Sequence, residues 1–351
     1  MKNKALFLFI CILTSLGIST AYAQPAPPPP PEKPVLYFPN EGPPVKITPS
    51  AGPRVNGSWN VYLTGEFIYW TVRQDGMFYA VSGAGANPSK GSVHDLDWEW
   101  EPGFKVGLGV NLPHDGWDLY AKYTWIQSST SDSTSQAAAT TTLTPYWVPT
   151  TVDFGFLSHA RASWDIHFND VNLELGRNSY LSQYFKVRIH AGLKGSWIDQ
   201  DYNVHYTYAA DGSRARIRQS QDFWGVGIRA GLNNSWQFLY NFCFYGDLAL
   251  SILWGQFDLD RNDQYTPAGN VAVTTLHTGV SPHTFEPVLE LGAGFRWDLW
   301  FGNGDYHFSL QAGWEHQLWI LQNELIKGLG EPDHIGDLVL QGLTVKARFD
   351  F

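Results

Sequence analysis

The sequence feature that most constrains this chain is an alternation of apolar and polar residues with a period of two. It is clearest at residues 343–351, which read LTVKARFDF. Successive side chains of a β-strand point to opposite faces, so this stretch predicts a strand with one apolar and one polar face. The edge strand of a soluble sandwich would show the same pattern, so the class of β-protein stays open at this point. The apolar face consists of Leu343, Val345, Ala347, Phe349 and Phe351.

The first 23 residues predict a secretory signal peptide. Lys2 and Lys4 precede an apolar run, and Ala21-Tyr22-Ala23 provides a small-x-small cleavage site. The segment is too short and too poorly flanked to be expected as a retained membrane span. We therefore expect residues 1–23 to be removed and the mature chain to begin at Gln24.

Composition limits how an exported chain of this kind can fold. Of its 351 residues, 16 % are charged and 15 % aromatic, the formal net charge is −10 and the mean hydropathy is −0.22. No stretch after residue 23 reaches the roughly 18 apolar residues of a transmembrane helix, which leaves a β-barrel as the way to span lipid. The acidic balance without a basic cluster argues against nucleic acid as a partner. Cys243 is the one cysteine after residue 23, so no internal disulfide is expected.

Residues 24–56 are rich in proline and include the run QPAPPPPPEKP at 24–34. Proline removes backbone donors and fixes φ, so this segment favours polyproline II and is excluded from a barrel wall. We expect a periplasmic leader at 24–56, preceding a barrel at 57–351. A spacer toward the cell wall, a ligand for a proline-binding partner and a disordered segment are all open interpretations.

From residue 57 onward, amphipathic stretches alternate with connectors, and the connectors alternate between long and short. This rhythm predicts an all-β, transmembrane, antiparallel up-and-down barrel of about ten strands, with short turns and both termini in the periplasm and long loops at the cell surface. The strand at 343–351 is expected to close onto a first strand near 58–71. Hairpins hidden in the long connectors would raise the number to about 12–16 strands, and this alternative stays open.

Three of the five long connectors are predicted at residues 128–161, 199–221 and 256–282. In the fourth strand, near 162–175, the apolar parity changes at Asn169-Asp170, which predicts a β-bulge there. Tryptophans near the strand ends predict two aromatic girdles at the membrane boundaries. One set, beside short turns, is Trp117, Trp236, Trp297 and Trp300; the other, toward long loops, is Trp70, Trp98, Trp100, Trp125, Trp164, Trp224, Trp254 and Trp319.

Several segments resemble a known family. WDLYAKYTWIQ at 117–127, DVNLELGR at 170–177 and the stretch 188–206 are similar to the Legionella-type major outer membrane protein family, which also occurs in chlamydia-like bacteria. A terminal Phe351 on an amphipathic strand likewise resembles the assembly signal of outer-membrane barrels. The resemblance implies an abundant integral outer-membrane protein that contacts membrane lipid and the barrel-assembly machinery and has porin or adhesin character. Related chlamydial porins are cross-linked through cysteines, which a chain with Cys243 alone makes doubtful here.

The inward parity of the expected strands carries charges of both signs, which predicts a polar lumen. We therefore expect a porin-like barrel for passive diffusion of small hydrophilic solutes. The alternative is a narrow, non-conducting barrel whose long loops bind a host or partner surface, since side chains can fill a ten-stranded lumen. A homo-oligomer is left open. The candidate lumen-lining residues are Glu66, Lys105, Lys122, Arg188, Glu290, Arg296, Glu315, Lys346 and Arg348.

No pattern in the sequence predicts catalysis. The histidines at 159 and 167 lie near Asp165 and Asp170, and His277 lies six positions before His283, but neither set has metal-ligand or nucleophile spacing. Exposed loop histidines are the simpler interpretation. We therefore expect no enzyme activity, no cofactor and no metal, and a buried, inert thiol at Cys243 on the lumen side.

Overall fold

The computed structural model describes residues 49–53, 55, 60–83, 91–135, 142–148, 155–327, 331–332 and 336–351. They belong to one compact unit, Thr48–Phe351, of β-strands and one 3-10 turn, η1 (Gly302–Gly304). In this part of the chain, no helix has the length and apolar character needed to cross a bilayer. The expected signal peptide at 1–23 and most of the proline-rich leader at 24–56 lie outside the described residues.

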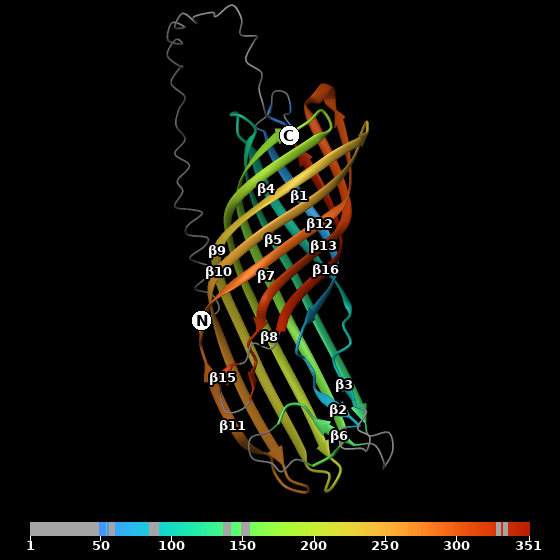
Figure 1. Cartoon of the computed structure of the whole chain (residues 1–351), viewed down its shortest axis with the longest axis vertical. Helices are drawn as coiled ribbons and strands as arrows, with labels where there is room; N and C mark the ends of the chain where they lie inside the picture. The colour runs from blue at the N-terminus through green and yellow to red at the C-terminus, as the bar shows by residue number, and fades with distance from the viewer. Residues whose placement is uncertain are drawn as a thin grey trace, which may run out of the picture. The chain divides into compact units, whose positions relative to one another are not determined.

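Ten long antiparallel strands close into a barrel (Figure 1). Neighbours in sequence are neighbours in the wall, and the last strand pairs with the first, from Tyr62 opposite Asp350 to Gln74 opposite Leu338. The predicted all-β class, the number of about ten strands and the closing pair are confirmed. The barrel strands are β1 (Val61–Gln74), β4 (Trp100–Asn111), β5 (Trp117–Ser135), β7 (Leu157–Tyr180), β8 (Phe185–Tyr208), β9 (Arg214–Leu239), β10 (Phe242–Thr266), β12 (His283–Phe301), β13 (Tyr306–Asn323) and β16 (Gly336–Asp350).

The two ends of the barrel differ in their connectors. We call one the turn end, because it carries the short connectors 112–116, 181–184, 240–241 and 302–305 together with residue 351. The opposite, loop end carries the long connectors. Short strands form in the long connectors, but none joins the closed ring within the described residues, so the alternative of 12–16 strands is wrong. These are β2 (Ala80–Ser82), β3 (Ser92–His94), β6 (Leu143–Pro145), β11 (Val273–Val280), β14 (Ile326–Lys327) and β15 (Glu331–Pro332).

The barrel strands are longer than the sequence predicted. β5 continues to Ser135, β8 to Tyr208 and β10 to Thr266, so the connectors expected at 128–161, 199–221 and 256–282 are partly strand. The physical reason is that threonine, tyrosine and valine favour extended backbone, and the alternation persists through these stretches. The prediction of a connector from residue 128 onward was therefore wrong for residues 128–135, which belong to β5.

Along the length of the barrel, the apolar side chains of the wall change from the outer face to the inner face. In β7, Ile166 and Phe168 face inward and are fully buried, whereas Leu173 and Leu175 face outward. Pairing of β7 with β5 and β8 is continuous through Asn169 and Asp170, so the predicted β-bulge is wrong. The change of parity has another cause: toward the turn end the outward residues are apolar, whereas toward the loop end the inward residues are apolar and form a buried core.

The same reversal occurs in β10. From Phe242 to Trp254 its even-numbered apolar side chains face outward, whereas Phe257 and Leu259 face inward and are buried. At about 3.4 Å per residue and a tilt of about 40°, the outward apolar stretch spans about 30 Å, which matches the hydrocarbon core of a bilayer. We call this part of the barrel the membrane half and the remainder the loop half.

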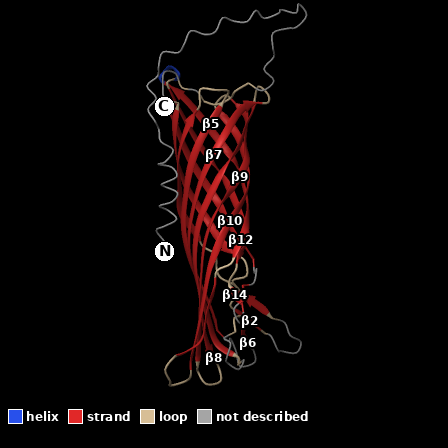
Figure 2. Ribbon diagram, turned by 90° about the vertical axis from the view of Figure 1, so that its left-hand side faces the viewer, coloured by secondary structure: helices blue, strands red, loops and turns tan. Residues whose placement is uncertain are grey.

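In the loop half, six strands form a curved sheet in the order β5-β7-β8-β9-β10-β11. The short strands of the long connectors lie beside it, as Figure 2 shows for β2, β6 and β14. Apolar residues of these connectors, including Tyr79, Leu143, Trp147 and Ile326, pack with inward side chains of the wall in one buried cluster. The loop half therefore has a protein-like apolar core inside the barrel.

This core corrects part of the girdle prediction. Trp70, Trp164 and Trp319 are fully buried in the core and do not lie at a lipid boundary. Trp224 and Trp254 do face outward at the level where the polarity reverses. Both kinds of tryptophan lie toward long loops in the sequence, and only their parity relative to the strand distinguishes them.

The described end of the proline-rich segment lies on the turn end of the barrel. Ser50 forms an isolated bridge with Ser179, and the Ala51 amide donates to the Asn178 carbonyl at 3.2 Å. The Tyr180 amide donates to the Pro49 carbonyl at 2.8 Å. Residues 49–51 are thus tied to β7, although the sequence placed them in a leader separate from the barrel.

Candidate functional site in the barrel lumen

A cavity of about 570 Å³ occupies the membrane half of the lumen. It extends from Tyr180 and Tyr240 at the turn end to Glu174 and Glu290 deeper in the barrel. Its walls are polar because most of the charged residues of the membrane half lie at the strand positions that face the lumen. None of the fully buried apolar residues of the loop half lines it, so the cavity ends where the apolar core begins.

One cluster of lumen charges joins both sides of the seam. Glu66 of β1 is opposite Lys105 of β4 and Lys346 of β16, and its carboxylate lies 3.7 Å and 3.1 Å from their ammonium groups. Lys105 also pairs with Glu315 of β13, which is not a neighbouring strand. The Lys105 ammonium lies 4.5 Å from the centre of the Trp70 ring, where the polar lumen meets the apolar core.

A second cluster crosses the lumen from β7, β8 and β9 to β12. The Lys194 ammonium lies 2.9 Å from Asp170 and 3.0 Å from Glu290. Arg229 lies 2.9 Å from Glu290 and also pairs with Glu174. Since β8 and β12 are separated by two strands, these pairs hold opposite parts of the wall together and fill the centre of the lumen.

Three arginines lie nearer the turn end. Arg188 bonds Asp118 at 2.6 Å and Glu174 at 2.8 Å. Arg348 and Arg296 each pair with the acid two residues later on the same strand, Asp350 at 2.6 Å and Asp298 at 3.0 Å. His307 joins these two acids, at 2.7 Å from Asp350 and 3.3 Å from Asp298.

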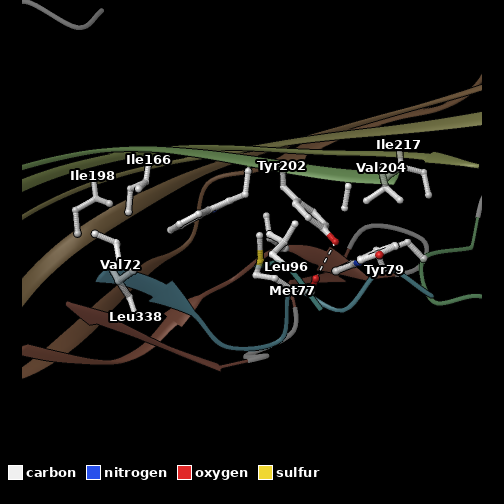
Figure 3. Close-up of a cluster of buried hydrophobic side chains, with 14 of the residues drawn as sticks. Val72, Met77, Tyr79, Leu96, Ile166, Ile198, Tyr202, Val204, Ile217 and Leu338 are labelled. Carbon is white, nitrogen blue, oxygen red and sulfur yellow. Dashed lines mark hydrogen bonds between the residues drawn. The ribbon is translucent and has the colours of Figure 1, made fainter. Parts of the chain in front are cut away.

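The apolar core of the loop half is fixed to the wall by hydrogen bonds from inward tyrosines (Figure 3). The Tyr202 hydroxyl donates to the Met77 carbonyl at 3.1 Å, and the Tyr206 hydroxyl donates to the Tyr79 carbonyl at 2.6 Å. The Tyr79 hydroxyl donates to Asp132 at 2.8 Å. Burial and this bond raise the pKa of Tyr79 well above its usual value, so its hydroxyl stays protonated as a donor at neutral pH.

Two further connectors are anchored in the same core. The Trp147 indole donates to the Phe78 carbonyl at 2.8 Å, which ties the connector after β5 to the connector after β1. Arg261 donates to the Ile326 carbonyl at 2.9 Å and to the Val148 carbonyl at 3.1 Å, and pairs with Asp263 at 2.8 Å. The described residues of these connectors therefore form a folded unit with its own hydrogen bonds.

The structure brings the predicted lumen residues together. Eight of the nine line the cavity, and Lys105 lies just beyond it, paired with Glu66 and Glu315. Lys122 differs from the other eight in its pairing: it lines the cavity and makes no ion pair within 4.0 Å in the part of the chain described. The expected assembly signal keeps its outward parity, with Leu343 and Phe351 exposed and Val345, Ala347 and Phe349 half-buried.

The sequence reasoning missed lumen residues that pair with the predicted ones. Asp118, Asp170, Glu174, Lys194 and Arg229 all lie on the inward parity of their strands and were detectable by that signal. The apolar core was missed for a different reason: its tryptophans were predicted at the lipid boundary, and its residues at 143–147 and 202–208 lie in stretches predicted as connectors.

The histidines do not assemble a site. His167 and Asp165 lie on the outer face of β7, whereas Asp170 points into the lumen and bonds Lys194. Among the described residues no group of three or more His, Cys, Asp or Glu side chains is arranged to hold a metal ion. Cys243 is buried, near Arg296 and Asp298 on the lumen side.

Solved structures with similar chains are outer membrane barrels. The outer membrane protease OmpT from Escherichia coli has 10 % identity and a TM-score of 0.36, with 83 % of this chain and 97 % of that chain covered. The toluene transporter TodX from Pseudomonas putida has 8 % identity and a TM-score of 0.31, with 83 % and 89 % covered. Scores this low support no inference about activity. No curated protein matches the chain.

The family assignment comes from the sequence match to a family model. The model described as the Legionella pneumophila major outer membrane protein precursor matches residues 52–351, which is nearly the whole described barrel. A closed ten-stranded wall with an outward apolar band agrees with that match. The chain therefore belongs to the Legionella major outer membrane protein family and is a β-barrel protein of the outer membrane.

Proposed function

We propose that this protein is a closed-lumen barrel whose loop half is a folded domain that presents a binding surface outside the cell. The observation that carries the proposal is the apolar core of the loop half. It blocks the path from the cavity to the loop end with packed side chains such as Tyr79, Trp147 and Tyr206. A diffusion pore has no need of such a core, whereas a binding surface needs loops held in one arrangement.

The proposal includes an orientation. The loop end faces the exterior and the turn end faces the periplasm, because long loops and polar outer faces suit the cell surface. Membrane lipid covers the outward apolar band, and the assembly machinery inserts the barrel. The role is not enzymatic. The outer face of the loop half also supports this orientation. Its outward residues on β7 to β10 are polar, as expected for a surface that projects from the membrane into water.

Solute diffusion is the second candidate function. It is favoured by the charged cavity of about 570 Å³, which would become a channel if the connectors after β1 and β5 left the lumen. Lys122 is suited to such a path because it projects into the cavity without an ion pair among the described residues. The two candidates differ in one measurable property, the conductance of the full-length protein.

Planar-bilayer recording of the purified protein tests the proposal. We expect no single-channel steps from the full chain and clear steps from a variant in which residues 75–98 and 136–156 are each replaced by a short Gly-Ser turn. Such turns are feasible because Thr71 is directly opposite Trp100, and Ser135 directly opposite His159, on the adjacent strands. The variant lacks Met77, Tyr79 and Leu96 of the core.

A matched control shortens another loop that contributes nothing to the core, residues 267–272 between β10 and β11, and it should stay silent. Regular conductance steps from the full-length protein would overturn the closed-lumen proposal and support solute diffusion.

A further inference from the structure

Within the described residues, β11 is a sheet edge of the loop half without a strand on its outer side. It ends the sheet order and is paired there with β10 alone, from Val280 opposite Leu259 to Val273 opposite Tyr265. Among the described residues no backbone hydrogen bond reaches the other side of Val273–Val280. Figure 1 shows β11 at the margin of the lower half of the barrel.

Part of this edge lacks the features that usually prevent strand addition. Natural edge strands are blunted by proline, lysine, a bulge that twists them away or a covering segment. Residues 273–280 read VTTLHTGV, with no proline and no lysine. The register with β10 shifts at Thr275, so the regular edge is residues 276–280, which extend for about 17 Å at about 3.3 Å per residue. The opposite margin of the same sheet, β5, is by contrast covered by the connector after β1. The Tyr79 hydroxyl donates to Asp132 of β5, and the Thr130 hydroxyl of β5 donates to the Asp97 carbonyl.

The side chains beside the edge specify what could pair with it. On the outer face, Gly279 lies directly opposite Asp260 of β10. An Asp260 carboxylate oxygen is only 3.6 Å from the position that a Gly279 side chain would start from, so the acid leans over the glycine toward the free edge. His277, two residues away on the same face, lies 3.9 Å from Asp260.

The inner face of the edge is apolar by comparison. Leu276 and Val280 are half-buried, and Val280 packs against the core. A strand added beside β11 would place alternate residues over this apolar margin. Its other residues would lie on the outer face, where a long basic side chain opposite Gly279 could extend over the glycine to Asp260.

A second copy of this chain fits the edge poorly. A two-fold axis normal to the membrane preserves strand direction, so a neighbouring barrel could offer only a parallel strand. Barrel strands tilt by about 40°, and facing strands of two adjacent barrels tilt in opposite senses, so they would cross at about 80°. That angle prevents a ladder of hydrogen bonds.

We propose that β11 is a β-augmentation site for an extended segment of another polypeptide, with basic and apolar residues in alternation and a lysine or arginine opposite Gly279. The inference rests on the proposed function, because it requires the loop half to be an exposed, folded surface. It names the binding mode and the chemistry of the partner: main-chain hydrogen bonds supply affinity, and Asp260 selects charge.

A fluorescent nonapeptide in which lysine alternates with valine and threonine serves as the probe, measured by anisotropy on the full-length protein in detergent. We expect saturable binding. Asp260→Asn should weaken it about two- to fivefold at low salt, the usual range for an exposed ion pair. Asp201→Asn is the matched control. Asp201 is likewise exposed on the outer face of the sheet, but on β8, two strands away from β10, so its loss should leave affinity unchanged.

Backbone methylation of the probe tests the strand pairing without altering the protein. N-methyl groups on one set of alternate residues should reduce binding at least about tenfold, and on the other set less than about twofold, because only one set of amides faces β11. Absence of binding, equal effects of the two methylated sets, or equal effects of the two Asp→Asn variants would overturn the proposal. The conductance of the full-length protein does not depend on a partner at β11, so this failure would leave the closed-lumen proposal standing.

Discussion

Lys194 shows how a charge is held inside a barrel that lies in lipid. Its ammonium contacts Asp170 and Glu290 and lies 5.2 Å from the centre of the Trp319 ring, and its side chain is fully buried. The desolvation cost of a buried cation is offset only while both carboxylates are present. Each buried lumen charge of this kind therefore neutralises its partners, and its loss leaves an unpaired charge.

Replacement of Lys194 by methionine keeps the length of the side chain and removes its charge. We expect the free energy of unfolding to fall by about 3–5 kcal/mol, because Asp170 has no other ion pair among the described residues. Urea unfolding in lipid vesicles, followed by tryptophan fluorescence, measures the change.

The double variant Lys194→Met with Asp170→Asn serves as the control, since it removes the unpaired acid as well and should recover part of the loss. A single variant as stable as the unmodified protein would show that the Lys194 pairs do not stabilise the lumen.

At the scale of the strand, long wall strands such as β7 and β10 carry two amphipathic patterns, one after the other. In the membrane half the outer parity is apolar, and in the loop half the inner parity is apolar, as β7 shows on the two sides of Asn169. A strand of this kind resists a shift in register in both halves, because a shift of one residue would expose one apolar face and bury one polar face at the same time.

Arginine substitutions along β7 test this reversal. Leu173→Arg, on the outer face within the apolar band, should cost about 2–4 kcal/mol of folding free energy. Ser163→Arg has the same parity ten residues nearer the loop end and should change stability by less than about 0.5 kcal/mol. Ile166→Arg, on the inner parity, should be severely destabilising because it places an unpaired charge in the core.

Folding into vesicles and the amount of protein in the outer membrane report these costs. If Ser163→Arg and Leu173→Arg were equally harmful, the lipid boundary would lie elsewhere on β7.

The same comparison shows what the sequence could predict. Strand number, the closing pair and the inward charges all follow from local alternation and the turn residues, such as Gly302-Asn303-Gly304 between β12 and β13. The apolar core could not be predicted in this way, because it depends on connectors far apart in sequence entering one lumen, as Met77, Trp147 and Ile326 do. Where the two halves meet, the apolar parity of β7 changes. Either a β-bulge or a core inside the barrel could explain that change, and the sequence alone favoured the bulge.

At the scale of the whole molecule, the membrane half of the barrel has a charged lumen with a cavity, and the loop half has a packed apolar core. The turn-end cavity and the loop-half core are separated by the level at which the wall reverses polarity, where Lys105 and Lys194 each lie over a tryptophan ring. Stability in the loop half thus comes from apolar packing, and stability of the lumen in the membrane half from ion pairs. The two halves should respond differently to salt and to loop deletion.

The orientation of this asymmetric molecule decides whether the loop half meets the exterior, and cysteine labelling tests it. Val271 at the loop end is 83 % exposed and Tyr240 at the turn end is 93 % exposed, whereas the native Cys243 is buried. With a membrane-impermeant maleimide on intact cells, we expect Val271→Cys to be labelled at once and Tyr240→Cys only after the outer membrane is permeabilised. The unmodified protein reports background reaction at Cys243. Labelling of Tyr240→Cys but not Val271→Cys on intact cells would invert the barrel and place the β11 edge in the periplasm, where it would face periplasmic polypeptides.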